Sequence, residues 1–199
     1  MKIIAKSVKS EINIKKSHFI CSLFPTNTKK ESKEIIKKIN KQYNDATHNC
    51  VAYIVNDGEG FDDDGEPAGT AGKPMINVLK KNEIKNVTAI VTRYFGGIKL
   101  GAGGLVRAYS KAVLEAIAQS VIIEVEYYDV YDFIFEYSNI KLVDNEVRNN
   151  NLIIIDKDYS NKVIYSVISK NNTNLSKQFN KYADKIKVKY KNKEIFKKI

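Results

Sequence analysis

The sequence predicts an α+β fold in two domains, 1–128 and 132–199. Apolar residues recur at helical spacing in some segments and alternate with polar residues in others, so both helices and strands are expected. All ten glycines lie between Gly58 and Gly104, whereas residues 121–199 contain no Gly, Pro, Cys, Met or His. This change in composition predicts a domain boundary near Tyr128–Asp132.

The first domain is expected to alternate strands with helices. An apolar stripe at helical spacing from Ile35 to Tyr43 predicts a helix over Lys29–Tyr43. Two loops, Asp57–Lys73 and Phe95–Ala102, contain most of the glycines. The remaining elements, from Val, Ile and Tyr content or from periodicity, are strands at Ile3–Ile14, His18–Phe24, His48–Asn56, Val87–Tyr94 and Val121–Glu126, a helix from Pro74 and a helix at Gly103–Ser120.

The second domain is expected to follow a βαββαβ order, which is the ferredoxin-like arrangement. Its expected elements are a strand at Val130–Tyr137, a helix at Ile140–Asn149, strands at Leu152–Asp158 and Lys162–Lys170, a helix at Asn174–Tyr182 and a strand at Lys185–Lys191. The last strand alternates, with Lys185, Lys187, Lys189 and Lys191 on one face. These lysines indicate either a solvated edge strand or a basic face that binds phosphate.

The chain is basic, with 33 Lys and Arg against 23 Asp and Glu and a formal net charge of +10 over 199 residues. Such a balance favours a nucleic-acid partner. Residues 1–130 carry 19 basic and 15 acidic side chains, and residues 131–199 carry 14 and 8, so the second domain is the more basic one. The chain is also rich in Lys, Asn and Ile throughout. The competing explanation of the charge is therefore the composition of the genome rather than a binding partner.

The sequence has no membrane or secretion signal that we recognise. No apolar run approaches the roughly 20 residues that span a bilayer, and the first residues lack the apolar block of a signal peptide. Cys21 and Cys50 are too few for a disulfide scaffold, and neither lies in a CxxC pair. We therefore expect a cytoplasmic protein with reduced thiols and no membrane partner.

The first glycine loop contains an acidic cluster, Asp63, Asp64 and Glu66. Pro74 follows Lys73, so the loop is not a Walker A sequence, and its consecutive aspartates do not have the spacing of an EF-hand. The carboxylates are expected to form an Asx-turn network, with a hard cation as the alternative. Gly69, Gly72 and Pro74 would let backbone amides approach an anion at the start of the next helix.

The second glycine loop runs from a buried strand into a helix N-terminus, where an anion is favoured. Its spacing does not fit the dinucleotide-binding pattern. Two of the three arginines in the chain, Arg93 and Arg107, flank it. Their planar forks suit either a phosphate ligand or a clamp on Asp64 or Glu66. The glycines of this loop are Gly96, Gly97, Gly101, Gly103 and Gly104.

Catalytic constellations are scarce, so no catalytic residue is predicted and an enzyme is not favoured. His48 and Cys50 would share one face of a strand, but no third orienting group is evident. Both cysteines lie in apolar strands and are expected to be buried thiols without a catalytic role. No metal-ligand spacing is present, and we expect no cofactor.

Three stretches, His48–Tyr53, Asp63–Pro74 and Val91–Tyr109, resemble the YigZ/IMPACT family almost word for word, and Lys16–Ile20 is similar to its N-terminal signature. The resemblance covers roughly residues 10–120 and extends, by length and strand order, to the bacterial two-domain branch. It implies a first domain of the type shared by a ribosomal protein and elongation factor G domain IV, and a second similar to domain V of that factor. Eukaryotic members regulate translation initiation by competing for an activator of an initiation-factor kinase.

Together these observations predict a translation-associated regulatory protein that binds RNA, the ribosome or a translation factor without catalysis. Lys73, Arg93, Lys99 and Arg107 would contact phosphate, and Tyr94 and Tyr109 would flank the ligand. One alternative is an enzyme or binder of a small anionic ligand between the two glycine loops, with Asp64 and Glu66 as acid and base. Another is a protein-interaction module whose loops are structural.

Overall fold

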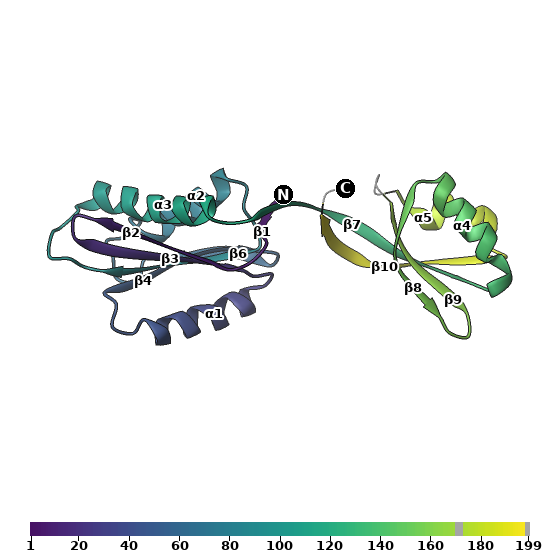
Figure 1. The fold of residues 1–199 in the computed structure, drawn as a ribbon, viewed down its shortest axis with the longest axis horizontal. Coiled ribbons are helices and arrows are strands. Elements are labelled where there is room, and N and C mark those ends of the chain that lie inside the picture. The colour runs from purple at the N-terminus through teal and green to yellow at the C-terminus, as the bar shows by residue number, and fades with distance from the viewer. Residues whose placement is uncertain (170–172, 198–199) are drawn as a thin grey trace. The chain divides into compact units, whose positions relative to one another are not determined.

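The computed structural model describes residues 1–169 and 173–197. The chain forms two compact units, Met1–Glu124 (unit 1) and Val125–Ile199 (unit 2), each with helices and a β-sheet (Figure 1). The protein is therefore α+β, as predicted. Lys170, the last residue of one expected strand, lies outside the described residues.

Unit 1 is built on a five-stranded antiparallel sheet in the order β2-β3-β6-β4-β5. Helix α1 covers one face of this sheet, and α2 and α3 cover the other (Figure 1). The bounds are Val8–Ile14 for β2, Ser17–Pro25 for β3, Lys29–Gln42 for α1, His48–Val55 for β4, Gly58–Asp62 for β5, Gly72–Lys81 for α2, Val87–Tyr94 for β6 and Ala102–Ala118 for α3.

The core of unit 1 lies mainly between the sheet and helices α2 and α3. Helix α3 buries small and aromatic residues, including Ala108, Tyr109 and Ala112, against strand residues such as Phe19 and Val91. Alanines let the helix approach the sheet closely, and burial of the larger side chains supplies most of the stabilisation. The second glycine loop is thus anchored at both ends, by the buried strand β6 and by α3.

The segment expected to separate the domains lies inside one long strand, β7 (Ile122–Phe135). Its first residues pair with β1 (Lys2–Ile4), and Val130 and Tyr131 pair with a strand of unit 2. Because no Gly or Pro interrupts this stretch, its alternating pattern continues as a strand across the expected boundary. The two strands expected at 121–126 and 130–137 are therefore one, and the expected strand at 3–14 divides into β1 and β2.

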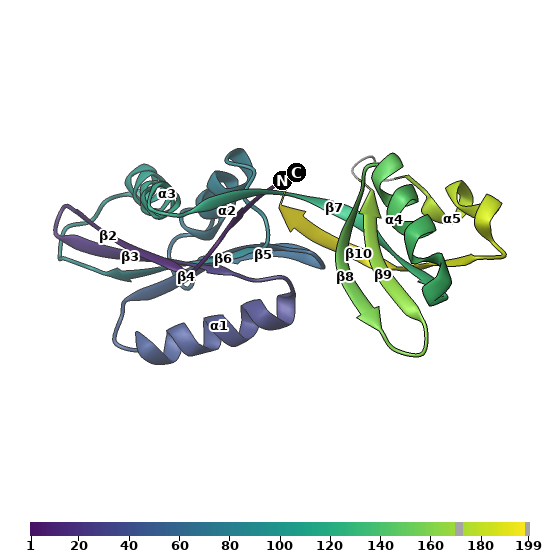
Figure 2. The ribbon, with the colours of Figure 1, turned by 45° about the vertical axis from the view of Figure 1, so that its right-hand side comes forward.

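Unit 2 has the element order β7-α4-β8-β9-α5-β10, with two short 3₁₀ segments. Its antiparallel sheet has the spatial order β10-β7-β9-β8. Helices α4 and α5 lie on the same face of that sheet (Figure 2), where Val143 and Phe179 pack against Phe133. The bounds are Ile140–Asn149 for α4, Leu152–Tyr159 for β8, Val163–Ser169 for β9, Leu175–Gln178 for α5 and Ile186–Lys197 for β10, with 3₁₀ turns at Tyr137–Asn139 and Asn180–Tyr182.

Two further sequence expectations need correction. The loop expected at 57–73 begins with β5, which pairs with β4 as a hairpin. The Gly and acidic residues of β5 are typical of turns, so the sequence did not indicate a strand there. The last strand extends to Lys197 instead of ending at Lys191, because a register shift between Tyr190 and Asn192 lets its pairing with β7 continue.

Candidate functional site

A pocket of about 420 Å³ lies in unit 1 between the two glycine loops. Its polar lining includes His48 from the start of β4, Glu66 from the first loop and Arg93 from β6. His48 and Arg93 are register partners in the β4–β6 pairing, so the sheet itself places their side chains side by side. The rest of the wall comes from Thr47, from Pro67 of the first loop, and from the second loop and the start of α3: Phe95, Lys99, Leu100, Gly101, Ala102 and Leu105.

Glu66 is the centre of a buried polar network. Its Oε1 accepts hydrogen bonds from Arg93 Nη1 at 2.5 Å and from the Tyr109 hydroxyl at 2.7 Å. The side chains of Glu66 and Arg93 are only 4% and 6% exposed. Of the two possibilities left open for the arginines, Arg93 adopts the internal clamp, and its partner is Glu66. The pair joins the first glycine loop to β6 and to α3.

This network holds two residues that were predicted to contact a ligand, Arg93 and Tyr109, inside the protein. Arg93 lies at the floor of the pocket, with its guanidinium 5.5 Å from the ring centres of both Phe19 and Phe95. Tyr109 is fully buried, and burial together with its carboxylate partner raises the pKa of its hydroxyl. Neither side chain offers the exposed surface that contact with a nucleic-acid backbone requires, because each is directed inward to Glu66. Glu66 is distant from both residues in the sequence.

His48, considered from sequence only as half of a Cys/His pair without a third orienting group, lines the pocket. Its Nδ1 lies 2.7 Å from the carbonyl oxygen of Asp64, and its Nε2 lies 3.9 Å from Glu66 Oε2. The carbonyl accepts only, so Nδ1 carries the hydrogen and the tautomer of the neutral ring is set. The group that orients His48 is this loop carbonyl, which only folding brings near.

The acidic loop uses its carboxylates to bind its own backbone. Asp63 accepts hydrogen bonds from the amides of Gly69, Ala71 and Gly72, with distances of 2.7 to 3.0 Å. Asp64 accepts from the Asn49 amide at 2.6 Å. In the part of the chain that the structure describes, no group of His, Cys, Asp and Glu side chains could hold a metal. The expected Asx-type network is therefore present.

The anion site expected at the start of α2 is occupied internally by the Asp63 carboxylate. The amides of Ala71 and Gly72 point to that side chain and are not open to a ligand. Lys73 is exposed and lines a separate depression with residues of α2 and α3. The first glycine loop is thus closed on itself, and Lys73 does not join the pocket.

The second glycine loop, by contrast, leaves the start of α3 open. The N-cap residue is Gly101, which has a φ of 70° and no side chain that could cap the helix. The first turn of α3 contains no acidic residue. Gly96 is required by a close approach, because an added Cβ would lie 1.9 Å from the carbonyl oxygen of Lys16. The loop therefore holds the turn after Ile14 close to the end of β6. The first amides of α3, beside the pocket, have no acceptor in the part of the chain that the structure describes.

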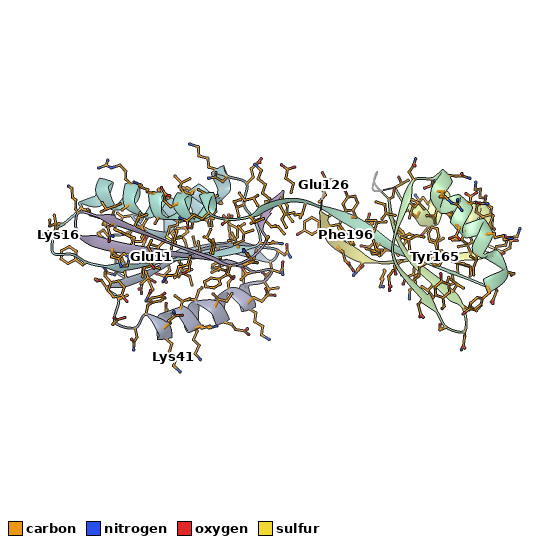
Figure 3. All side chains as sticks on the ribbon, viewed as in Figure 1. Glu11, Lys16, Lys41, Glu126, Tyr165 and Phe196 are labelled. Atoms are coloured by element: carbon orange, nitrogen blue, oxygen red, sulfur yellow. The ribbon has the colours of Figure 1, made fainter. Side chains whose placement is uncertain are left out.

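Basic side chains gather around this second loop. Lys15, Arg107 and Lys111 line one shallow depression, and Leu100 lines both that depression and the pocket. Lys16 lies at the same end of unit 1, in the turn between β2 and β3 (Figure 3), and its backbone contacts Gly96. We call Lys15, Lys16, Lys99, Arg107 and Lys111 the loop-2 basic surface; no ion pair of these five is found among the described residues.

The remaining candidates, Tyr94, Gly97, Gly103 and Gly104, are not among the residues that line the pocket. Tyr94 donates a hydrogen bond to Asp45 at 2.9 Å and stacks near His18. Gly97 has a φ of 81°, and Gly103 and Gly104 lie in the first turn of α3.

The predicted C-terminal basic face belongs to unit 2. Lys185 precedes β10, and Lys187 and Lys189 are exposed on that strand. Lys191 lies 3.7 Å from Asp132 and donates to the Ser166 hydroxyl, so its charge is partly balanced within the sheet. The exposed positions left for a polyanion on this strand are therefore mainly Lys187 and Lys189.

The two thiols are expected to be unreactive in the folded protein. The Cys50 thiol has two acceptors within reach of its single hydrogen, the Asp63 carbonyl and Tyr109 Oη. Burial raises the pKa of Cys50 to about 12, and burial also raises the pKa of Cys21. At pH 8 the thiolate of Cys50 is then about one part in 10⁴. Iodoacetamide followed by mass spectrometry should label neither cysteine in the native protein and both in urea. Rapid native labelling of Cys50 would instead indicate an activated thiol.

These features define a two-unit α+β protein with a ligand-sized pocket between two glycine loops, one closed by its own carboxylates and one open. Residues 15–117 match the family described as the Impact N-terminal domain. The chain therefore belongs to the IMPACT family, which confirms the resemblance noted from its motifs. None of the described helices is both long enough and apolar enough to cross a bilayer.

Individual relatives agree with this assignment. The chain is 45% identical to IMPACT family member YvyE of Bacillus subtilis over 156 residues, covering 77% of this chain and 72% of that protein. It is 46% identical to IMPACT family member YigZ of Escherichia coli over 111 residues, about half of each chain. A solved structure described as a hypothetical protein covers 97% of this chain with 32% identity and a TM-score of 0.66.

Proposed function

We propose that this protein is a translation-associated regulator that binds RNA through the loop-2 basic surface. The observation that carries the proposal is the gathering of five basic side chains, without ion-pair partners in the described residues, around the open start of α3. Unpaired cations beside free backbone amides favour phosphate groups. Arg107 is exposed there, and its planar fork suits bidentate contact with phosphate.

The domain types support the same role. We infer that unit 1 is of the kind shared by a ribosomal protein and elongation factor G domain IV, and that unit 2 is ferredoxin-like, similar to domain V of that factor. The βαββαβ order of unit 2 and its β10-β7-β9-β8 sheet support the second inference. Unit 2 has exposed basic side chains of its own, Lys187 and Lys189, that suit contact with phosphate.

The proposal predicts a specific salt dependence of RNA binding. Replacing Lys15, Arg107 and Lys111 with Gln should reduce the slope of log affinity against log salt by roughly one unit for each phosphate that the variant no longer neutralises. The measurement is fluorescence anisotropy with a short labelled single-stranded RNA at several salt concentrations. Melting temperatures of all variants show whether a loss of affinity reflects unfolding.

A matched control is available on the opposite face of the same sheet. Lys37, Lys38 and Lys41 are exposed on α1, and their replacement with Gln removes the same charge. Figure 3 shows Lys41 on that helix. This control should leave the slope nearly unchanged. Equal slopes for the wild type and both triple variants would exclude RNA binding by this surface and favour a protein partner. Co-sedimentation of the protein with ribosomes after RNase treatment would favour a protein partner as well.

A further inference from the structure

Two polar atoms in the pocket, Glu66 Oε2 and His48 Nε2, face each other, and neither has a hydrogen-bond partner among the described residues. Glu66 Oε1 already accepts from Arg93 and Tyr109, but Oε2 accepts no hydrogen bond within residues 1–169 and 173–197. It lies 3.9 Å from His48 Nε2, which is beyond hydrogen-bond reach. The Glu66 side chain is 4% exposed, and that of His48 is 20% exposed. The pair is thus shielded from bulk water but opens into the pocket.

The tautomer of His48 makes this arrangement a site for a donor group. Because Nδ1–H donates to the Asp64 carbonyl, Nε2 of the neutral ring can only accept. In that tautomer two acceptors face each other across the pocket, a placement that suits a donor group between them. An ammonium or hydroxyl group of a ligand can donate to both Nε2 and Oε2.

The same pocket also offers an environment for an anion and for an apolar group. Its wall includes Lys99 and the uncapped start of α3 at Gly101, both favourable to a carboxylate. Phe95 and Leu105 contribute apolar surface. A volume of about 420 Å³ is in the range of small-molecule sites.

We propose that this pocket binds a small carboxylic acid that carries an amino or hydroxyl group on the adjacent carbon and an aliphatic side chain. The amino or hydroxyl group lies between His48 Nε2 and Glu66 Oε2. The carboxylate faces Lys99 and the amides of α3, and the side chain packs against the apolar wall. This site is separate from the residues varied in the RNA experiment, so each proposal can fail alone.

The test uses four probes that differ by one group each. L-leucine has all three features, 2-hydroxy-4-methylpentanoate replaces the amino group with hydroxyl, 4-methylpentanoate lacks the donor and leucinol lacks the carboxylate. Calorimetry gives the affinities. Ring ¹H–¹⁵N spectra report on His48 directly, because the chain has two histidines and His18→Gln leaves one. The free protein should show His48 protonated at Nδ1.

We expect leucine, its hydroxy analogue or both to bind and to shift the His48 ring signals. 4-Methylpentanoate and leucinol should bind about tenfold or more weakly, because each lacks one of the two polar groups that the pocket recognises. His48→Ala should lower the affinity of the bound acid by about tenfold, as should Lys99→Ala. His18→Gln is the matched control and should leave the affinity unchanged.

Three results would overturn the proposal. The first is no shift of the His48 signals with either substituted acid at about 10 mM, a concentration that detects even weak sites. The second is equal affinity for all four probes, which would indicate nonspecific apolar binding. The third is unaltered affinity in His48→Ala. Because His48 is partly exposed, its removal should preserve the fold, and a melting curve verifies this.

Discussion

Arg93→Met is expected to lower the free energy of unfolding by about 3–5 kcal/mol. The substitution keeps a long apolar side chain between Phe19 and Phe95 but leaves the Glu66 carboxylate buried without its cation. Breaking a buried ion pair by removing one partner is costly because the other charge remains desolvated. Urea denaturation followed by circular dichroism measures the effect.

Two companion variants distinguish a stranded charge from weakened packing. Adding Glu66→Gln to Arg93→Met removes the charge and should recover a large part of the stability. Arg93→Lys keeps the charge without the fork and should give an intermediate melting temperature. The surface pair Lys80–Glu59, about half exposed, is the control: Lys80→Ala should cost no more than about 1 kcal/mol. An Arg93→Met effect as small as this control would contradict the clamp.

Asp63→Ala is expected to lower the free energy of unfolding by about 3 kcal/mol. The carboxylate accepts three backbone N–H groups, and two of them, from Ala71 and Gly72, are buried at the start of α2. Removing it takes away a helix cap and leaves donors without an acceptor. Asp63→Asn keeps an acceptor oxygen and should be destabilised less. Thermal and urea unfolding measure both variants.

The control for this variant is Asp62→Ala. Asp62 is exposed, and its side chain accepts one hydrogen bond within the described part of the chain, from the Asp64 backbone amide, so its removal should cost about 1 kcal/mol or less. Addition of Ca²⁺ or EDTA to the wild type separates the capping role from a cation site. We expect no change in melting temperature; a Ca²⁺-dependent rise that disappears in Asp63→Ala would show that the loop binds a cation instead.

Elements with a strong local pattern were predictable from sequence. Strand Val87–Tyr94 and helix Ile140–Asn149 have the bounds that their periodicity predicts. Strand β5 was missed, because its glycines and acidic residues suggest a turn and its stability depends on pairing with β4. The continuous strand β7 was divided wrongly, since composition changes near its middle but its backbone pairing does not.

The candidate site was also predictable only in part from the sequence. Glycine spacing and arginine usage indicated both loops, because tight turns and forked cations require those residue types. Sequence left open whether an arginine would clamp Asp64 or Glu66, and 27 positions separate Arg93 from its actual partner, Glu66. His48 was set aside because the group that orients it, the Asp64 carbonyl, carries no side-chain signal.

The sequence by itself determined the α+β class, the family and the two glycine loops, because these depend on periodicity and on residue types with narrow conformational uses. Only the tertiary structure decided which loop is open. The β4–β6 register places His48 opposite Arg93, and the first loop folds its Asp63 carboxylate onto the start of α2. Which of several carboxylates Arg93 contacts depends on which strands pair with one another. That pairing is determined by the whole sheet and not by any local stretch of sequence.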